Sequence, residues 1–190
     1  NAVDDLENRY AIYPVSAAYD ALQEYAHPGK EQRYFYTFGW SGLVSQQRRR
    51  KEAVRFYNML QQEYARFRAQ GISPKIRIIT HSHGGNVALN MAGIADLLQK
   101  GLDVEPKATD YPEADQLTAI LAIHKILGAL PDKQQALERP HQKNWDFMPS
   151  KEPLVIDELY LLGTPIQPET AHFFASPFFR KVYHLYSAGD

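Results

Sequence analysis

The chain contains no cysteine among its 190 residues, which excludes disulfides, thiolate metal sites and a cysteine nucleophile. It also lacks an excess of charge, because 21 basic and 22 acidic residues leave a formal net charge of −1. No global field therefore favours nucleic acid or an anionic membrane. No apolar run approaches the ~20 residues of a membrane span, and the start carries no signal-peptide pattern. We expect no nucleic-acid partner and no transmembrane segment.

The pattern along the chain predicts alternating helices and strands. A hydrophobic share of 44% is enough for one compact domain with a sizeable core, spanning residues 1–190. Apolar residues at helical spacing predict helices at 15–25, 48–70 and 87–100, and short β-branched or aromatic runs predict strands at 33–40, 76–79, 154–162 and 181–186. This alternation predicts an α/β fold of three layers (α/β/α) with a mostly parallel sheet, possibly incomplete at both ends.

Residues 101–153 interrupt the alternation. They carry one predicted helix at 114–130, followed by a polar stretch with Trp145, Phe147 and Met148. The segment is too long for an ordinary connection, and such insertions in open sheets often lie over the ligand crevice. It is interpreted either as a lid over a substrate site or as a helical insertion packed on the sheet edge.

A basic run, Arg48-Arg49-Arg50-Lys51, opens the predicted helix at 48–70. Such a run can form a nucleic-acid patch, but no second basic cluster accompanies it here. We therefore expect these residues to form a solvated first helical turn.

The most informative stretch is Thr80-His81-Ser82-His83-Gly84-Gly85, between a β-branched run and an apolar periodic segment. This order predicts a strand, a sharp small-residue turn and a helix. A serine at the tip of such a turn exposes its hydroxyl, and the N–H groups of the first helical turn provide a field suited to a developing oxyanion. We expect Ser82 at a strained turn between a strand ending near Thr80 and a helix starting near His83. The alternative is a glycine-rich turn with a surface serine.

These residues resemble the nucleophile elbow of the α/β-hydrolases, G-x-S-x-G, with Thr80 in place of the first glycine. The resemblance is to lipase-like and esterase-like members, and three other segments come in the order of that family: Phe38-Gly39-Trp40-Ser41-Gly42, Leu161-Leu162-Gly163-Thr164-Pro165, and the last strand with its continuation to Asp190. It implies that Ser82 is the nucleophile, that the N–H of His83 helps to hold the oxyanion, and that Asp190 is the acid. Asp190 would then lie at the carboxyl end of a parallel strand, on the sheet edge of Ser82. Glu169 is the substitute acid.

The resemblance leaves two parts of the catalytic machinery unassigned. The order in the family is serine, acid, histidine, and no histidine follows Asp190 in this sequence. His81, His83, His172 and His184 are present but are each expected to have other roles. The second oxyanion donor normally comes from a loop near the start of the domain, and nothing before residue 15 matches it. Either the chain is a fragment cut at both ends, which we favour, or residues 38–42 take the place of that loop.

Two functions follow from the sequence. The first is a serine hydrolase of carboxylic esters, acting on an ester or lipid small molecule through an acyl-enzyme, with no metal or organic cofactor. The second is a binding or structural protein on a hydrolase fold that has lost catalysis, which the missing histidine supports. In either case we expect the 190-residue chain alone to hydrolyse activated esters poorly or not at all.

Overall fold

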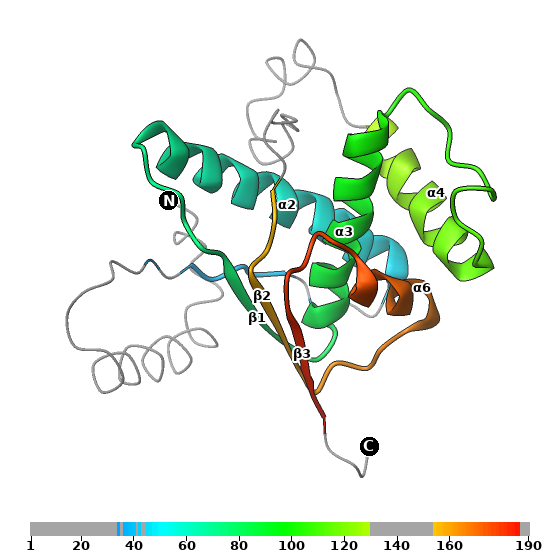
Figure 1. Ribbon diagram of the computed structural model, residues 1–190. Coiled ribbons are helices and arrows are strands. Elements are labelled where there is room, and N and C mark those ends of the chain that lie inside the picture. Colours follow the sequence, from blue (N-terminus) through cyan, green and yellow to red (C-terminus); the bar gives the residue numbers. More distant parts are fainter. Residues whose placement is uncertain (1–33, 35, 41, 43–44, 130–153, 187–190) are drawn as a thin grey trace. The chain divides into compact units, whose positions relative to one another are not determined.

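The computed structural model describes residues 34, 36–40, 42, 45–129 and 154–186. The chain divides into two compact units, residues 1–41 and 42–190, and every helix and strand below belongs to the second. In chain order these elements are α2 (Gln46–Ala69), β1 (Arg77–His81), α3 (Gly84–Lys100), α4 (Ala114–Gly128), β2 (Glu158–Leu162), α6 (Pro168–Ala171), the 3₁₀ helix η3 (His172–Ala175) and β3 (Val182–Leu185) (Figure 1).

The three strands form one parallel sheet in the order β1-β2-β3. Parallel neighbours need long crossovers, which α3 and α4 provide between β1 and β2, and α6 and η3 between β2 and β3. The backbone hydrogen bonds continue past the strand ends, since Ser82 N donates to Leu162 O at 2.9 Å and Gly163 N to Leu185 O at 2.8 Å. The predicted α/β class with a parallel sheet is therefore confirmed, and the carboxyl ends of the strands meet at one edge of the sheet.

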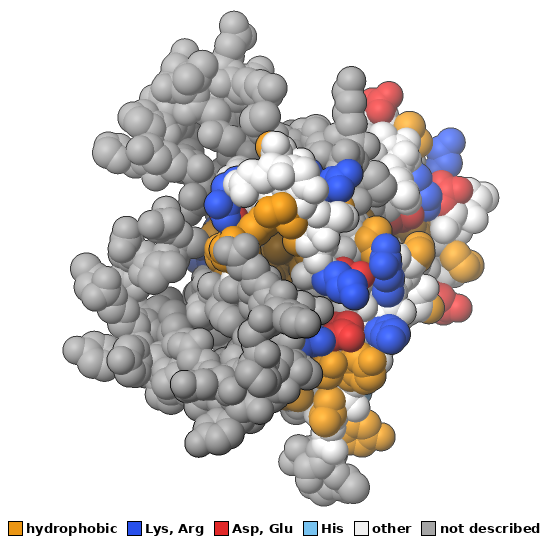
Figure 2. Space-filling view, turned by 60° about the vertical axis from the view of Figure 1, so that its left-hand side comes forward, with side chains coloured by type: hydrophobic (Ala, Val, Ile, Leu, Met, Phe, Trp, Pro, Cys, Tyr) orange, Lys and Arg blue, Asp and Glu red, His pale blue; other side chains and the backbone are white. Residues whose placement is uncertain are grey.

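The two faces of the sheet differ in burial. Ile78, Leu159 and Leu161 point to one face and are buried, and α3 packs there against β1 and β2 and also contacts α2. On the opposite face Ile79 is 47% exposed and Leu185 is 53% exposed. Hydrophobic side chains are also visible at the lower edge of the described surface in Figure 2. The described residues thus provide one helical layer against the sheet.

The predicted strand at 33–40 is wrong for the part that the structure describes. Tyr34 and residues 36–40 are assigned to no strand, and Tyr34 and Tyr36 are about half exposed. Aromatic residues favour strands, but whether such a segment joins a sheet depends on tertiary context, which local sequence does not contain. The predicted helix at 15–25 and residues 130–153 of the insertion lie outside the described residues.

The described half of the insertion packs on the helical layer and not on the sheet edge. Helix α4 contacts α2, α3 and α6, and Ile120 and Ile123 on it are fully buried. Gly93 of α3 permits this close approach, because a Cβ there would lie 2.9 Å from Ile123 Cδ1. The loop before α4 is fixed by Tyr111, whose hydroxyl donates to the Asp96 carboxylate and accepts from Lys100 Nζ at 3.0 Å. The lid interpretation concerns residues that are mostly outside this description.

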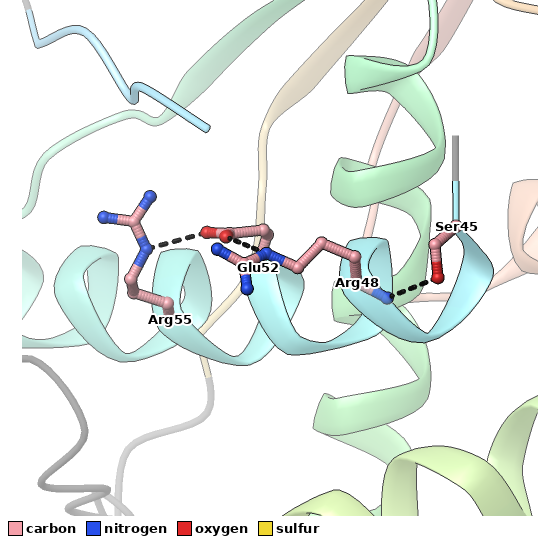
Figure 3. A network of polar contacts seen from close by, with 4 residues as sticks. All are labelled: Ser45, Arg48, Glu52 and Arg55. Atoms are coloured by element: carbon pink, nitrogen blue, oxygen red, sulfur yellow. Dashed lines mark hydrogen bonds and ion pairs between the residues drawn. The ribbon is translucent and has the colours of Figure 1, made fainter. Parts of the chain in front are cut away.

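Helix α2 begins with a side-chain cap and an ion-pair ladder (Figure 3). Ser45 Oγ accepts a hydrogen bond from Arg48 N at 3.4 Å, which satisfies one of the free N–H groups of the first turn. Glu52 pairs with Arg48 at 3.1 Å and with Arg55 at 2.8 Å along one side of the helix. The predicted solvated first turn is wrong for the other two arginines, because Arg49 is 1% exposed and Arg50 is 8% exposed. Adjacent helical residues point about 100° apart, so a run of like charges necessarily enters the buried face.

Candidate active site

Ser82 lies at a strained turn between β1 and α3, as predicted. Strand β1 ends at His81, α3 begins at Gly84, and the φ angle of Ser82 is 51°, the only positive value of a non-glycine residue in the described part of the chain. The N–H of Ser82 is held by Leu162 and its carbonyl accepts from Gly85 N at 3.1 Å. A left-handed serine costs about 1–3 kcal/mol, so the flanking ladder and helix hold it in place.

Gly85 allows α3 to start directly against β2. A Cβ at this position would lie 2.3 Å from Thr164 Oγ1, 2.5 Å from Thr164 Cγ2 and 2.9 Å from Leu161 Cδ2. No side chain fits at these distances, so glycine is required for the close approach of helix and strand. The second glycine after the serine therefore serves the packing of α3 against the turn that follows β2.

Two backbone N–H groups follow Ser82 without a backbone acceptor. Gly85 N bonds to Ser82 O, and Asn86 N and Val87 N bond to His83 O, whereas no backbone bond of the described residues uses the N–H of His83 or of Gly84. These donors stand at the amino end of a 17-residue helix, where the aligned peptide dipoles favour negative charge. The turn therefore presents a hydroxyl beside two free donors, an arrangement suited to holding an oxyanion.

The segment after β2 is tied to the same turn. Asn86 Nδ2 donates to Pro165 O at 2.9 Å, and Asn86 Oδ1 accepts from Thr170 Oγ1 at 2.6 Å. Asn86 itself is fully buried, so both bonds are made away from water. The turn at Gly163-Thr164-Pro165 thus lies at the same edge of the sheet as Ser82.

In the described part of the chain, no histidine is hydrogen-bonded to the Ser82 hydroxyl. His81 is exposed at the end of β1, and His83 is the N-cap residue of α3, with its Nδ1 buried and without a partner among the described residues. His184 lies on β3 with its Nε2 3.1 Å from Thr164 O. His172 is on η3, where burial lowers its pKa against the opposing effects of a Pro168 backbone bond and nearby carboxylates. The base of a catalytic triad is not among these contacts.

Of the two candidate acids, Asp190 and Glu169, the structure describes only Glu169. Asp190 lies outside the described residues, although β3, the strand before it, ends at the sheet edge of Ser82. Glu169 stands in the first turn of α6 and accepts from Gln46 Nε2 at 2.9 Å. Its charge also opposes the lowering of the Arg49 and Arg50 pKa values by burial. Glu169 therefore faces the amino end of α2 and stabilises the charged forms of Arg49 and Arg50 there. None of its described hydrogen bonds is to a histidine.

Sequence reasoning missed several buried polar atoms without hydrogen-bond partners among the described residues. Within the described ranges these atoms belong to Gln46, Arg49, Arg50, His83, Asn90, Thr164 and His172. All of them lie on the first turns of α2, the first half of α3 or the segment after β2. Native structures leave few such atoms, and those that occur together mark sites completed by water, an ion or a ligand. A sequence signal existed, because Arg49 precedes Ala53 by one helical turn and so shares its buried stripe.

Comparison with known proteins found no matching family model, and no curated protein or solved structure with significant similarity to the chain. Within the described ranges, no group of histidine and carboxylate side chains is arranged to hold a metal ion. No helix there is both long enough and apolar enough to cross a bilayer.

Proposed function

We propose that this protein is a serine hydrolase of carboxylic esters, related in fold to lipase-like α/β-hydrolases. The observation that carries the proposal is Ser82, held at a φ of 51° between a parallel strand and a helix, beside the N–H groups of His83 and Gly84, which make no backbone hydrogen bond in the described part of the chain. Backbone strain of this kind is costly and persists where a function needs a hydroxyl presented at a fixed point. An ordinary surface turn would place glycine or asparagine there.

In the proposed reaction the Ser82 oxygen attacks the acyl carbon and its proton passes to a histidine base. The carbonyl oxygen becomes an oxyanion and accepts hydrogen bonds from the N–H groups of His83 and Gly84. Collapse of the tetrahedral species expels the alcohol, which takes the proton from the histidine, and water then hydrolyses the acyl-enzyme by the same route. We place the base outside the described residues and assign its orientation to Asp190.

We also propose the complete three-layer architecture. The face of the sheet that carries Ile79, Tyr183 and Leu185 is partly exposed and rich in apolar and aromatic surface. A parallel sheet is normally covered on both faces, since its strands are apolar on both sides. A second helical layer on this face would complete the α/β/α arrangement that the alternation of elements predicts.

A second candidate function is binding without catalysis on the same fold. It is favoured by the Ser82 hydroxyl having no histidine partner in the described part of the chain, while Glu169 is engaged with α2. A fluorophosphonate probe separates the two functions, because it labels only an activated serine. Labelling at Ser82, in this chain or in a version extended into its natural flanking sequence, supports the hydrolase. Failure of both to label supports the binding protein.

A further inference from the structure

We propose that Arg49 and Arg50 form a binding site for a phosphate-type oxyanion, and that the ester substrate carries this group. The link to a substrate rests on the proposed hydrolase function, whereas binding of the oxyanion itself does not. The site lies on the first turns of α2, next to the segment that follows β2.

The two guanidinium groups have more positive charge and more donors than their described surroundings satisfy. Both side chains are more than nine-tenths buried, and Arg49 Nη2 donates to Gln167 Oε1 at 2.8 Å. In the part of the chain that the structure describes, Arg49 Nε, Arg49 Nη1 and Arg50 Nε have no hydrogen-bond partner. Of the described acidic groups, Glu169 is the one whose charge acts on both arginines, and it already accepts from Gln46. A buried, unpaired cation is costly, so an anionic group from elsewhere would stabilise this arrangement.

The helix adds to the positive field at the same place. Helix α2 has 24 residues and no acidic residue in its own first turn, so no residue of that turn offsets the positive end of its dipole. The desolvated guanidinium groups lie within this turn and the next, which combines two full charges with the field of the helix. An anion is the complementary ligand for such a field.

Hydrogen bonds connect Arg49 to the elbow through the segment after β2. Gln167 Oε1 accepts from Arg49, Pro165 O accepts from Asn86, and Thr170 donates to Asn86, so this one short segment contacts the starts of both α2 and α3. This segment leaves the carboxyl end of β2, the sheet edge where ligands of open α/β sheets bind. An oxyanion held by Arg49 and Arg50 would therefore anchor a substrate at the edge where Ser82 presents its hydroxyl.

The donor set favours phosphate over carboxylate. Guanidinium groups bind both anions through paired N–H donors in a fork. The unpartnered nitrogens belong to two different guanidinium groups, and a tetrahedral phosphate has enough oxygens to accept from both, whereas a carboxylate has two. The group belongs either to a phospholipid headgroup or to a small phosphate ester, which share this chemistry.

The test is an equilibrium titration of the 190-residue chain with inorganic phosphate at constant ionic strength, followed by the arginine side-chain N–H resonances and by the melting temperature. We expect saturable binding, shifts of the Arg49 and Arg50 signals, and a melting temperature that rises with phosphate. Arg50→Gln and the milder Arg50→Lys, which keeps the charge but loses the fork, should each weaken binding by roughly tenfold or more. Arg66→Gln, in the last turn of the same helix, is the matched control and should bind as the wild type does.

Non-saturable binding in the wild type, or equal binding by the Arg50 variants, would overturn the proposal. Sulfate, acetate and a short-chain phosphatidic acid are the comparison ligands. Acetate binding as tightly as phosphate would overturn the preference for a tetrahedral anion, and competition by the phosphatidic acid would identify a lipid headgroup as the source. Ser82→Ala should bind phosphate normally. Phosphate binding without labelling of Ser82, in this chain and in the extended version alike, refutes the hydrolase alone, and labelling without phosphate binding refutes the anion site alone.

Discussion

Replacing Gly85 by alanine tests how closely the elbow is packed. The added Cβ would lie 2.3 Å from Thr164 Oγ1 and 2.9 Å from Leu161 Cδ2, well inside van der Waals contact, so α3 and the turn after β2 must separate. Overpacking of this kind costs about 1–3 kcal/mol. Alanine regains about 0.5–1 kcal/mol through its helix propensity. Because the 2.3 Å approach puts the clash in the upper part of the overpacking range, we expect a net loss of up to about 2.5 kcal/mol in the free energy of unfolding.

Two other glycines separate the clash from other effects of the same substitution. A Cβ at Gly71 meets nothing within 4 Å, but its φ of 75° is strained for alanine, and we expect a loss of about 1 kcal/mol. A Cβ at Gly128, in the last turn of α4, also meets nothing, and alanine there should be neutral or stabilising by about 0.5 kcal/mol. Urea unfolding followed by circular dichroism measures all three variants. A Gly85→Ala protein as stable as Gly128→Ala would refute the close packing of the elbow.

Three further predictions concern strain, a buried contact and pH. Ser82→Gly should be about 1 kcal/mol more stable than Ser82→Ala in urea unfolding, because both lack the hydroxyl and only glycine relieves the φ of 51°; equal stabilities would show that the turn is unstrained. Tyr111→Phe should lower the free energy of unfolding by about 1 kcal/mol, since the buried hydroxyl bonds to Asp96 and Lys100, and an unchanged midpoint would refute this. Burial lowers the His172 pKa below its ordinary 6.5, so the unfolded chain takes up the proton first and stability should fall as pH drops from 6.5 through the lowered value. His172→Gln should flatten that decline in thermal melts, and an identical decline would assign it to other groups.

Local sequence signals predicted the elements around the elbow. The β-branched run before Ser82, the small residues after it and the apolar stripe of the next helix are short-range patterns, and β1, the turn and α3 formed within a few residues of the predicted bounds. The predicted helix at 48–70 likewise ends where α2 does, just before Gly71 with its positive φ. These features depend on backbone propensity and periodicity, which the sequence contains directly.

The wrong predictions concern contacts between segments that are distant in the sequence. Four consecutive basic residues predict a solvent-exposed turn, but in the helix Arg49 lies against Gln167 and Arg50 is close enough to Glu169 to feel its charge. Glu169 was a candidate acid by its position after a strand, and its described bond is instead to Gln46. The strand predicted at 33–40 has the right composition, but the ladder that a strand requires is a tertiary property.

The nucleophilic role of Ser82 is tested most directly by mass spectrometry of the protein after fluorophosphonate treatment, with the chain extended at both ends into its natural flanking sequence. The account predicts one adduct, mapped to the peptide containing Ser82, and its complete loss in Ser82→Ala. A Ser82→Ala protein that still forms the adduct, or an extended wild type that forms none, would contradict the assignment of Ser82 as the nucleophile.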